Sequence, residues 1–334
     1  MKIKRLGRTG LKVSEICLGT MTFGNQADEA TSHAIMDKAF DAGVFFFDTA
    51  DVYPLGGTPE MVGRTEQFIG SWLKGKRDKI VLATKCRGAM GPEANSQGAS
   101  RRHIMEAVEG SLRRLGTDYI DLYQIHSPDP ETPLEETLRA LDDLVHSGKV
   151  RYIGCSNYPA WEVCKALWIS DKQGLARFDC VQPRYNLLFR HIESELFPLA
   201  VDQGIGIICY NPLAGGVLTG RYQPGQQPVE GTRFTLRNAG RLYQARYWHD
   251  IQLQAVAQLK KTCQERNLSL AQVALAWVLS HSAITSAILG ASKPEQLNET
   301  LPAVDLKLDE EMMRICDDVW YQLPRERDPQ IAYR

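Results

Sequence analysis

The sequence predicts an α/β protein, a (β/α)8 TIM barrel that spans residues 1–334 as a single domain. Three observations support this prediction. Short apolar strands alternate with amphipathic helical stretches along the chain, eight such strands can be counted, and each strand from the second onward ends in polar residues. A length of 334 residues suits one such barrel with added segments.

The first half of the chain supplies an N-terminal β-hairpin and four strands. The hairpin is expected over residues 2–14, where two alternating segments flank a Gly-Arg-Thr-Gly turn. The strands are expected at residues 15–19, 44–48, 80–85 and 120–126, and the first three of them lead into helices at 28–42, 59–74 and 101–115. Strands that alternate with helices in this way indicate a parallel sheet.

The second half completes the eight strands and adds two segments outside the repeat. Strands are expected at 151–157, 180–183, 206–212 and 287–292, and helices at 134–147, 160–173, 193–203 and 294–300. Residues 213–246, rich in Gly, Pro, Gln and Arg, follow strand 7 as a long loop that is either disordered or a lid, and we favour the lid. From Leu308 the chain predicts an extra C-terminal helix with a polar end, packed outside the barrel.

Composition favours a small-molecule ligand. The chain has 39 basic and 40 acidic residues and no run of five like charges, so neither nucleic acid nor an anionic membrane is indicated as a partner. The first residues lack the apolar core of a signal peptide, and no apolar run approaches the length of a membrane span. We therefore expect a cytoplasmic protein; the sequence favours no particular oligomeric state.

The cysteines and most of the histidines are expected to be structural. Eight scattered cysteines form no CxxC pair and have no histidine at zinc-ligand spacing, which indicates a reduced protein without a metal site. Cys86 should point away from its neighbour Lys85 and serve the core rather than redox chemistry. Six histidines lie on helical or loop stretches and are expected at the surface, namely those at 33, 103, 146, 191, 249 and 281.

Polar residues at the predicted strand ends should meet at one mouth of the barrel. They are Asp48, Lys85, His126, Ser156 with Asn157, Gln182, Tyr210 with Asn211, and residues 290–293. A single polar residue at a strand end is usually a solvated end, a cap or part of a surface ion pair. Convergence of seven such ends favours a functional site instead.

Tyr53, five residues after Asp48, gives this group a chemical role. A free tyrosine has a pKa of about 10, and a nearby ammonium such as that of Lys85 favours the phenolate and makes the hydroxyl a better proton donor. Asp48 would keep Lys85 charged, and His126 would orient a substrate carbonyl by a hydrogen bond. The structural alternatives are a turn tyrosine, a buried ion pair and a strand-end histidine.

The sequence lacks the residue patterns that other kinds of chemistry require. No nucleophile is paired with a base, no cluster of metal ligands is evident, and no phosphate-binding lysine motif occurs, which argues against hydrolysis, metal catalysis and phosphoryl transfer. A carbonyl that is protonated on oxygen must gain a group at carbon, and a hydride from a nicotinamide cofactor is the natural complement. Because no GxGxxG motif opens a strand-turn-helix unit, a Rossmann domain is not indicated.

Seven segments occur in the order typical of one known family: FFDTADVY, ATK, LYQIH, GCSN, VQPRYN, YNPLAGGVLTG and GASKPEQL. With GRTGLKVSEICLGTMTFG at the start and GASKPEQLNE near the end, the chain resembles the aldo-keto reductases over essentially its whole length. The resemblance implies a (β/α)8 barrel that reduces aldehydes or ketones to alcohols with NADPH. It also implies a catalytic tetrad of Asp48, Tyr53, Lys85 and His126, with Tyr53 as general acid. Retention of His126 favours carbonyl over carbon-carbon double-bond reduction.

The resemblance also implies a set of NADPH contacts. The expected cofactor-binding residues are Gly19, Thr20, Met21, Asp48, Ser156, Asn157, Gln182, Tyr210, Pro212, Leu213, Gly215, Gly290, Ser292, Lys293, Gln296 and Glu299. Lys293 favours NADPH over NADH, but Gln296 stands where many members carry an arginine, and Thr300 where an asparagine is usual, so use of both cofactors stays open. Phe23, Tyr247 and Trp248 are expected to line the substrate pocket because of their loop positions.

Two other functions are compatible with the same barrel. One is an NADPH-binding, redox-sensing regulatory subunit that resembles the potassium-channel β subunits and turns over little substrate. The other is a Schiff-base enzyme in which Lys85 attacks a carbonyl. The absence of an N-terminal extension argues against the first alternative, and the acid Asp48, which should keep Lys85 charged, argues against the second.

Overall fold

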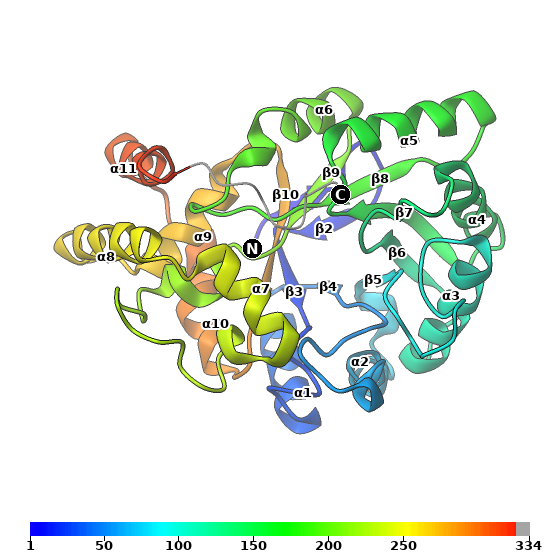
Figure 1. The fold of residues 1–334 in the computed structure, drawn as a ribbon, viewed down its shortest axis with the longest axis horizontal. Helices are drawn as coiled ribbons and strands as arrows, with labels where there is room; N and C mark the ends of the chain where they lie inside the picture. Colours follow the sequence, from blue (N-terminus) through cyan, green and yellow to red (C-terminus); the bar gives the residue numbers. More distant parts are fainter. Residues whose placement is uncertain (325–334) are drawn as a thin grey trace. The chain divides into compact units, whose positions relative to one another are not determined.

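Eight parallel strands close into a barrel in the computed structural model, which describes residues 1–324 (Figure 1). Contacts divide the chain into two compact units, and the whole barrel belongs to the first, which comprises Met1–Pro183, Ile192–Tyr210 and Ala283–Pro294. The second unit comprises Arg184–His191, Asn211–Ser282 and the chain from Glu295 onward. The predicted fold class is confirmed by the barrel, whereas a single domain over residues 1–334 stays a prediction.

The barrel strands follow one another around the ring in chain order. They are β3 (Ile16–Gly19), β4 (Phe46–Asp48), β5 (Val81–Cys86), β6 (Ile120–Ile125), β7 (Val150–Ser156), β8 (Phe178–Gln182), β9 (Gly206–Cys209) and β10 (Ile284–Gly290), and β10 pairs with β3 to close the ring. Most of their residues are buried, as expected for parallel strands covered on both faces. All eight strands therefore end at the same mouth.

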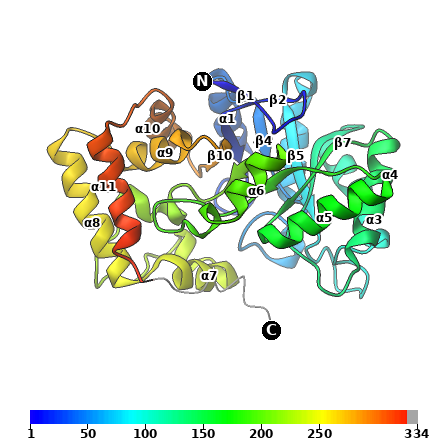
Figure 2. The same ribbon diagram turned by 90° about the horizontal axis from the view of Figure 1, so that it is seen from above.

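Helices of the first unit lie outside the strands (Figures 1 and 2). They are α1 (Glu29–Asp41), α2 (Arg64–Leu73), α3 (Arg101–Leu115), α4 (Leu134–His146), α5 (Ala160–Gln173) and α6 (Leu196–Gln203), with short 3-10 turns η1 (Pro59–Met61), η2 (Arg77–Lys79) and, bridging the two units in sequence, η3 (His191–Glu193). Asp28 caps α1 by accepting a hydrogen bond from the Thr31 amide at 2.8 Å. The single helix predicted over 59–74 is divided in two because Gly63, with φ of 84°, precedes α2.

The N-terminal hairpin closes the end of the barrel where the strands begin. Strands β1 (Ile3–Arg5) and β2 (Lys12–Ser14) pair antiparallel, as predicted. Leu6 and Val13 of this hairpin are fully buried in one core cluster with barrel side chains such as Phe46 and Ile208. Arg8 also donates a backbone hydrogen bond of 2.7 Å to the carbonyl of Gly204, just before β9. Apolar burial thus fills this end and leaves the polar residues at the other.

Within residues 1–324, all elements assigned to the second unit are helices. Its elements are η4 (Ala214–Thr219), η5 (Arg233–Thr235), α7 (Arg237–Tyr247), α8 (Asp250–Glu265), α9 (Leu270–Ser280), α10 (Glu295–Thr300), η6 (Leu301–Val304) and α11 (Glu310–Tyr321). Helix α9 contacts α8, α10, α11, η4 and η6 and is the centre of the unit. The expected C-terminal helix is confirmed as α11, while residues 325–328 of its predicted polar end lie outside the described residues.

The sequence pattern missed several helices in this part of the chain. The long segment predicted over 213–246 does follow the seventh barrel strand, β9, and it contains η4, η5 and most of α7. Helices α8 and α9 follow where the sequence pattern predicted no element. Helix α9 is buried on most of its sides, so its sequence LAQVALAWVLS lacks the polar face that marks a helix in sequence.

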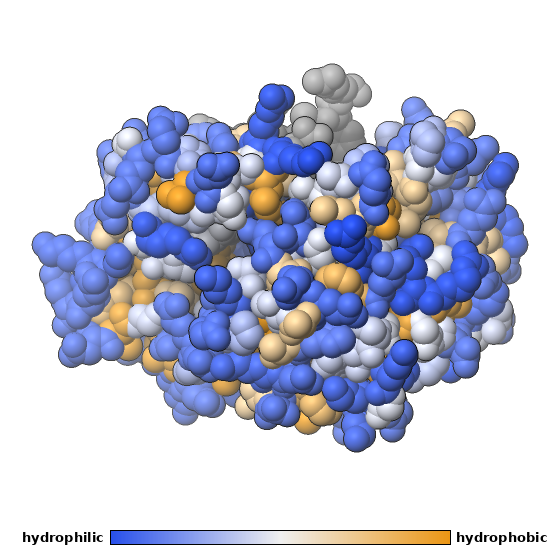
Figure 3. All heavy atoms as spheres, turned by 90° about the horizontal axis from the view of Figure 1, so that it is seen from below, coloured by the Kyte–Doolittle hydropathy of each residue, from blue (hydrophilic) through white to orange (hydrophobic). Residues whose placement is uncertain are grey.

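The surface is mostly hydrophilic on the face that Figure 3 shows, where hydrophobic side chains form small, separate groups. Among residues 1–324, no helix combines the length and the apolar character that crossing a membrane requires.

Candidate active site

Four residues that the sequence singled out lie together at the mouth of the barrel in the first unit. Asp48 is the last residue of β4, Lys85 lies in β5, His126 follows β6, and Tyr53 belongs to the loop after β4. The Lys85 Nζ lies 5.1 Å from the centre of the Tyr53 ring, and the rings of Tyr53 and His126 are 5.7 Å apart in an edge-to-face arrangement. The strand ends therefore converge as the barrel topology predicts.

Lys85 and Asp48 form a buried ion pair. The Lys85 Nζ donates hydrogen bonds to Asp48 Oδ1 at 2.5 Å and to the carbonyl of Thr49 at 2.8 Å. Lys85 has no exposed surface and Asp48 is 3% exposed. Burial alone would lower the pKa of Lys85, but the charge and hydrogen bond of Asp48 together with Tyr53 outweigh it, so the pKa lies above its ordinary value. Lys85 is therefore charged at neutral pH, unlike a Schiff-base lysine, which must be neutral.

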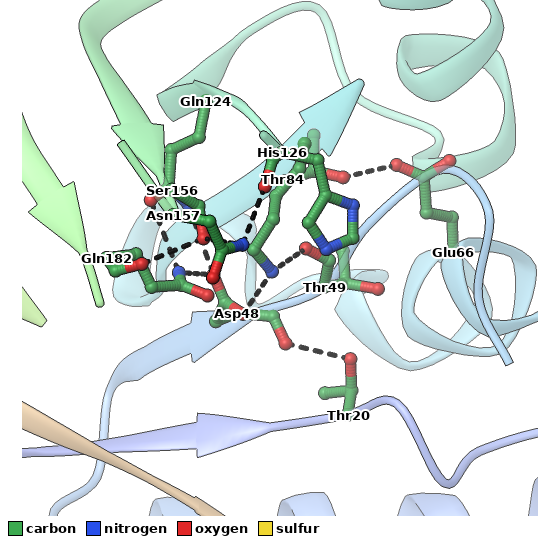
Figure 4. Close-up of polar contacts among 11 residues, drawn as sticks. Thr20, Asp48, Thr49, Glu66, Thr84, Gln124, His126, Ser156, Asn157 and Gln182 are labelled. Carbon is green, nitrogen blue, oxygen red and sulfur yellow. Dashed lines mark hydrogen bonds and ion pairs between the residues drawn. The ribbon is translucent and has the colours of Figure 1, made fainter. Parts of the chain in front are cut away.

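The Asp48 carboxylate is fixed by two further side chains. Its Oδ2 accepts hydrogen bonds from the Nε2 of Gln182 at 2.8 Å and of Gln124 at 3.2 Å (Figure 4). Its backbone carbonyl accepts hydrogen bonds from the amide of Thr20 at 3.1 Å and from its hydroxyl at 2.9 Å. Residues of β5, β6 and β8 thus hold the carboxylate, and Thr20, which follows β3, holds the backbone of the same residue, so the negative charge beside Lys85 is fixed in place.

His126 is neutral over the whole physiological pH range. Burial lowers the pKa of its imidazole to about 3, and the positive charges of Lys85 and Arg87 act in the same direction. Its amide donates a hydrogen bond to the carbonyl of Cys86 at 2.9 Å, and its carbonyl accepts one from Asn157 Nδ2 at 2.9 Å. A neutral imidazole held in this way keeps one ring N–H as a hydrogen-bond donor.

The loop that carries Tyr53 is bound at several points of its backbone. The Tyr53 amide donates to the carbonyl of Ala50 at 3.2 Å, and its carbonyl accepts from the amide of Gly63 at 3.1 Å. Two residues later, the Leu55 amide donates to the carbonyl of Met21 at 2.9 Å. These backbone hydrogen bonds fix the position of the Tyr53 ring. The side chain is partly exposed, so solvent or a ligand can reach it.

A second polar group joins the ends of β7, β8 and β9. The Ser156 hydroxyl donates to the carbonyl of Gln182 at 2.8 Å, Asn157 Nδ2 donates to Ser156 Oγ at 3.0 Å, and the Tyr210 hydroxyl donates to Asn157 Oδ1 at 2.8 Å. Asn157 has φ of 61°, a left-handed conformation that asparagine tolerates better than most residues. Amide and hydroxyl groups beside an aromatic ring match the chemistry of a nicotinamide, which carries a carboxamide on a flat ring.

The other cofactor-binding candidates of the first unit lie at the ends of β3 and β10. Gly19 ends β3, and a Cβ at this position would lie 2.6 Å from Cγ2 of Ile288. Thr20 is buried against Asp48 and Met21 is partly exposed. Gly290 ends β10, and after it come Ser292 and the exposed Lys293.

The remaining cofactor-binding candidates belong to the second unit. Pro212 and Leu213 precede η4, Gly215 lies within it, and Gln296 and Glu299 lie in α10. Gly215 and Gly216 have φ of 69° and 103°, conformations that glycine adopts without strain. Because these residues belong to a different unit from the barrel, their roles stay predictions.

The three predicted pocket residues are largely buried. Phe23 and Tyr247 have no exposed surface, and Trp248 is partly buried. The Tyr247 hydroxyl accepts a hydrogen bond of 3.1 Å from Asn186 Nδ2, and the Phe23 carbonyl accepts one of 2.7 Å from the Thr65 hydroxyl. A contact of these three residues with substrate stays a prediction.

One histidine expectation is wrong, and one cysteine expectation is confirmed. His103 is only 2% exposed, although its helical position suggested the surface, because it lies on the buried side of α3. Cys86 is fully buried, as predicted, and burial raises the pKa of its thiol, so it is an unreactive core residue. Among the eight cysteines only Cys164 is exposed.

Sequence reasoning missed a buried polar cluster behind the candidate site. Glu66 of α2 accepts hydrogen bonds from the Thr84 hydroxyl at 2.6 Å and from Arg114 Nε at 2.8 Å. Asp51 is fully buried near them, and its amide donates to the carbonyl of Lys85 at 3.0 Å. Burial, together with the charge of Glu66, raises the pKa of Asp51 well above its ordinary range. The sequence signal for Asp51 was its position between Asp48 and Tyr53. Gln124, which donates a hydrogen bond to Asp48, was also missed, and its signal was the strand alternation that places it on the same side of β6 as His126.

Comparison with known proteins places the chain in a family. The model of the Aldo/keto reductase family matches residues 15–321. The chain is 41% identical to "Uncharacterized oxidoreductase YrpG" of Bacillus subtilis, over 96% of each chain. It is 40% identical to "Probable voltage-gated potassium channel subunit beta" of Oryza sativa, over 92% of each, and 36% identical to "Protein tas" of Escherichia coli, over 94% of this chain and 96% of the relative. This chain therefore belongs to the aldo/keto reductase family.

Proposed function

We propose that this protein reduces aldehydes or ketones to alcohols with NADPH, and that Tyr53 is the general acid. The observation that carries the proposal is the convergence of Tyr53, the charged Lys85 and the neutral His126 at the mouth of the barrel. A relative that is 34% identical carries the name "Versiconal hemiacetal acetate reductase", which supports reductive chemistry. The name of the relative YrpG supports an oxidoreductase more generally.

The residues of the barrel mouth suit a nicotinamide cofactor. When bound, this cofactor would supply a hydride to the carbonyl carbon. Ser156, Asn157 and Gln182 would hold the carboxamide, and Tyr210 would contact the ring. Lys293 offers an exposed cation for a 2'-phosphate, which favours NADPH, although a lysine is a weaker phosphate ligand than the bidentate arginine that Gln296 replaces.

The chain's own residues would govern the proton. Tyr53 would donate its hydroxyl proton to the carbonyl oxygen, and the Lys85 ammonium would favour the phenolate that remains. Asp48 would keep Lys85 charged and in place through their 2.5 Å hydrogen bond. The neutral His126 would donate a hydrogen bond to the carbonyl oxygen and so orient the substrate before the transfer.

The substitution Tyr53→Phe tests the proposal because it removes one hydroxyl and keeps the ring. We expect turnover of NADPH with an aldehyde, followed by nicotinamide absorbance, to fall by about 10²- to 10⁴-fold, the usual contribution of a general acid. Binding of NADPH, followed by nicotinamide fluorescence, should not change. Comparable turnover in the variant and the native protein would refute the assignment of Tyr53.

A second candidate function is an NADPH-binding regulatory subunit. Relatives of Oryza sativa, Arabidopsis thaliana and Schizosaccharomyces pombe, which are 40%, 39% and 37% identical, carry names as probable or putative potassium channel β subunits. A broad panel of aldehydes and ketones separates the two functions. Purified protein that retains NADPH but oxidises it with no member of the panel would favour the regulatory function.

A further inference from the structure

Arg87 stands at the mouth of the barrel without a role in the reaction proposed above. It directly follows β5, two residues after Lys85, and is partly buried. Its φ of 116° is uncommon for a residue other than glycine, and a backbone hydrogen bond of 2.9 Å from the Gly98 amide to its carbonyl holds the loop there. Unusual backbone conformations of this kind cluster at ligand-binding positions.

The guanidinium of Arg87 has unused hydrogen-bonding capacity. Its Nε is buried, and within residues 1–324 it meets no acceptor. Asp129 is near enough for the Arg87 charge to contribute to the lowered pKa of its carboxyl. The Asp129 Oδ2, however, already accepts hydrogen bonds from the Ala99 amide at 2.6 Å and from the Thr132 hydroxyl at 2.8 Å. A buried arginine donor without an acceptor is costly, and a ligand anion beside the partly exposed Arg87 side chain would offset this cost.

Arg87 and His126 are neighbours at the ends of two paired strands. Strands β5 and β6 pair with Cys86 opposite Ile125, and the His126 amide donates to the Cys86 carbonyl at 2.9 Å, so the next residues of both strands are neighbours. The effect of the Arg87 charge on the imidazole of His126 agrees with this proximity. An anion bound by Arg87 would therefore lie next to the residue that is proposed to orient the carbonyl.

We propose that Arg87 binds a carboxylate carried by the aldehyde or ketone substrate. This inference rests on the proposed function and names the substrate class for the same site. A planar guanidinium matches a carboxylate with two parallel hydrogen bonds, and one cation suits a single negative charge. Lys85, the other cation near His126, is already committed to Asp48. A doubly charged phosphate would require more positive charge than Arg87 supplies.

The experiment compares two substrates that differ in one charge, 4-formylbenzoate and methyl 4-formylbenzoate. The native protein should have the higher kcat/KM with the carboxylate. In Arg87→Met, which keeps the side-chain length, the value for the carboxylate should fall by about 10- to 100-fold, the range expected for hydrogen bonds to a charged group, while the value for the ester stays within about twofold. In Arg87→Lys, kcat/KM for the carboxylate should lie between the values of the native protein and Arg87→Met, because lysine keeps the positive charge but cannot form two parallel hydrogen bonds.

The control variant is Arg102→Met, which removes the same charge from an exposed arginine of α3 whose partner is Glu106. It should leave both substrates unchanged. An equal loss with acid and ester in Arg87→Met would overturn the inference, and so would a native preference for the ester. If Arg87→Met loses kcat/KM equally with acid and ester and also gains a new inflection in the pH profile of kcat/KM, the role of Arg87 is to keep His126 neutral, and the carboxylate site is refuted.

Failure of the proposed function would be visible separately. If neither substrate is reduced, the reductase assignment fails, and calorimetric titration of 4-formylbenzoate into the protein, with and without NADP+, then decides on Arg87 alone. Binding to the native protein that is weakened at least tenfold in Arg87→Met supports the carboxylate site. Equal binding, or no binding to either protein, overturns it.

Discussion

Replacing Asp48 with asparagine tests whether this carboxylate keeps Lys85 charged. The variant keeps the shape of the side chain but removes the negative charge next to an ammonium that has no exposed surface. Removal of one partner of a buried ion pair usually costs about 3–5 kcal/mol of folding free energy. The lysine can limit this loss by giving up its proton, because burial lowers its pKa and the largest opposing effect, the charge of Asp48, is gone.

The two states of Lys85 predict opposite dependences of stability on pH. In the native protein the pKa of Lys85 is raised, so its contribution is fully present below the unfolded value of about 10.4 and is lost only as the pH rises through the folded value. In Asp48→Asn the folded pKa falls below the unfolded value, so stability should increase with pH. If the folded lysine is neutral at pH 7, the gain between pH 7 and 9 is about 2.7 kcal/mol.

Urea denaturation at pH 7, 8 and 9 measures this difference. Glu106→Gln is the matched control, because it makes the same kind of change in an exposed pair with Arg102, where the expected loss is at most about 0.5 kcal/mol. Asp48→Asn should also lose most turnover, since Tyr53 would no longer face a charged lysine. A variant as stable as the native protein at pH 7, with no dependence on pH up to 9, would refute the reasoning.

Three further outcomes follow from buried groups. The pKa of Asp51 is raised in the folded state, so its contribution to the free energy of unfolding is present at pH values below the unfolded pKa of about 3.9 and is lost as the pH rises toward the folded pKa. Asp51→Asn should therefore gain stability relative to the native protein from pH 4 to pH 7, as measured by urea denaturation. A difference in stability that does not change with pH would contradict this. Because the pKa of His126 is about 3, kcat/KM should show no histidine inflection between pH 5 and 8, and an inflection near 6.5 would mean that the imidazole titrates normally. Gly70→Ala should lower stability by about 1–3 kcal/mol in the same assay, despite the better helix propensity of alanine, because its Cβ would lie 2.3 Å from a carbonyl oxygen of α3. Gly10→Ala, with nothing within 4 Å, is the control, and equal effects of both changes would refute the packing argument.

The barrel was predictable because its signals are local. Each strand is a short apolar run, and from β4 onward polar residues stand at its end or next to it, so Asp48, Lys85 and His126 are marked by position alone. The helices with a polar face were also predicted well, as α3 and α5 begin and end where the pattern indicates. Burial of both barrel faces makes this alternation of strand and helix the strongest pattern in the chain.

The missed features depend on contacts between distant residues. Gln124 is a polar residue in a buried strand, and its purpose becomes evident only through Asp48, 76 residues earlier. The same holds for Glu66, which meets Arg114 and Thr84 from separate elements. Helix α9 was missed for the opposite reason, because a helix surrounded by other helices has no polar stripe in its sequence.

The hairpin that fills one end of the barrel has a practical consequence for handling the protein. Leu6 and Val13 close the end opposite Tyr53, and the neighbouring Ile3 is 61% exposed. An affinity tag or a surface linker joined ahead of Met1 would thus leave from the closed end of the barrel. Immobilisation through the N-terminus would keep the mouth of the barrel facing the solution, whereas trimming the first 14 residues would open its apolar floor to water.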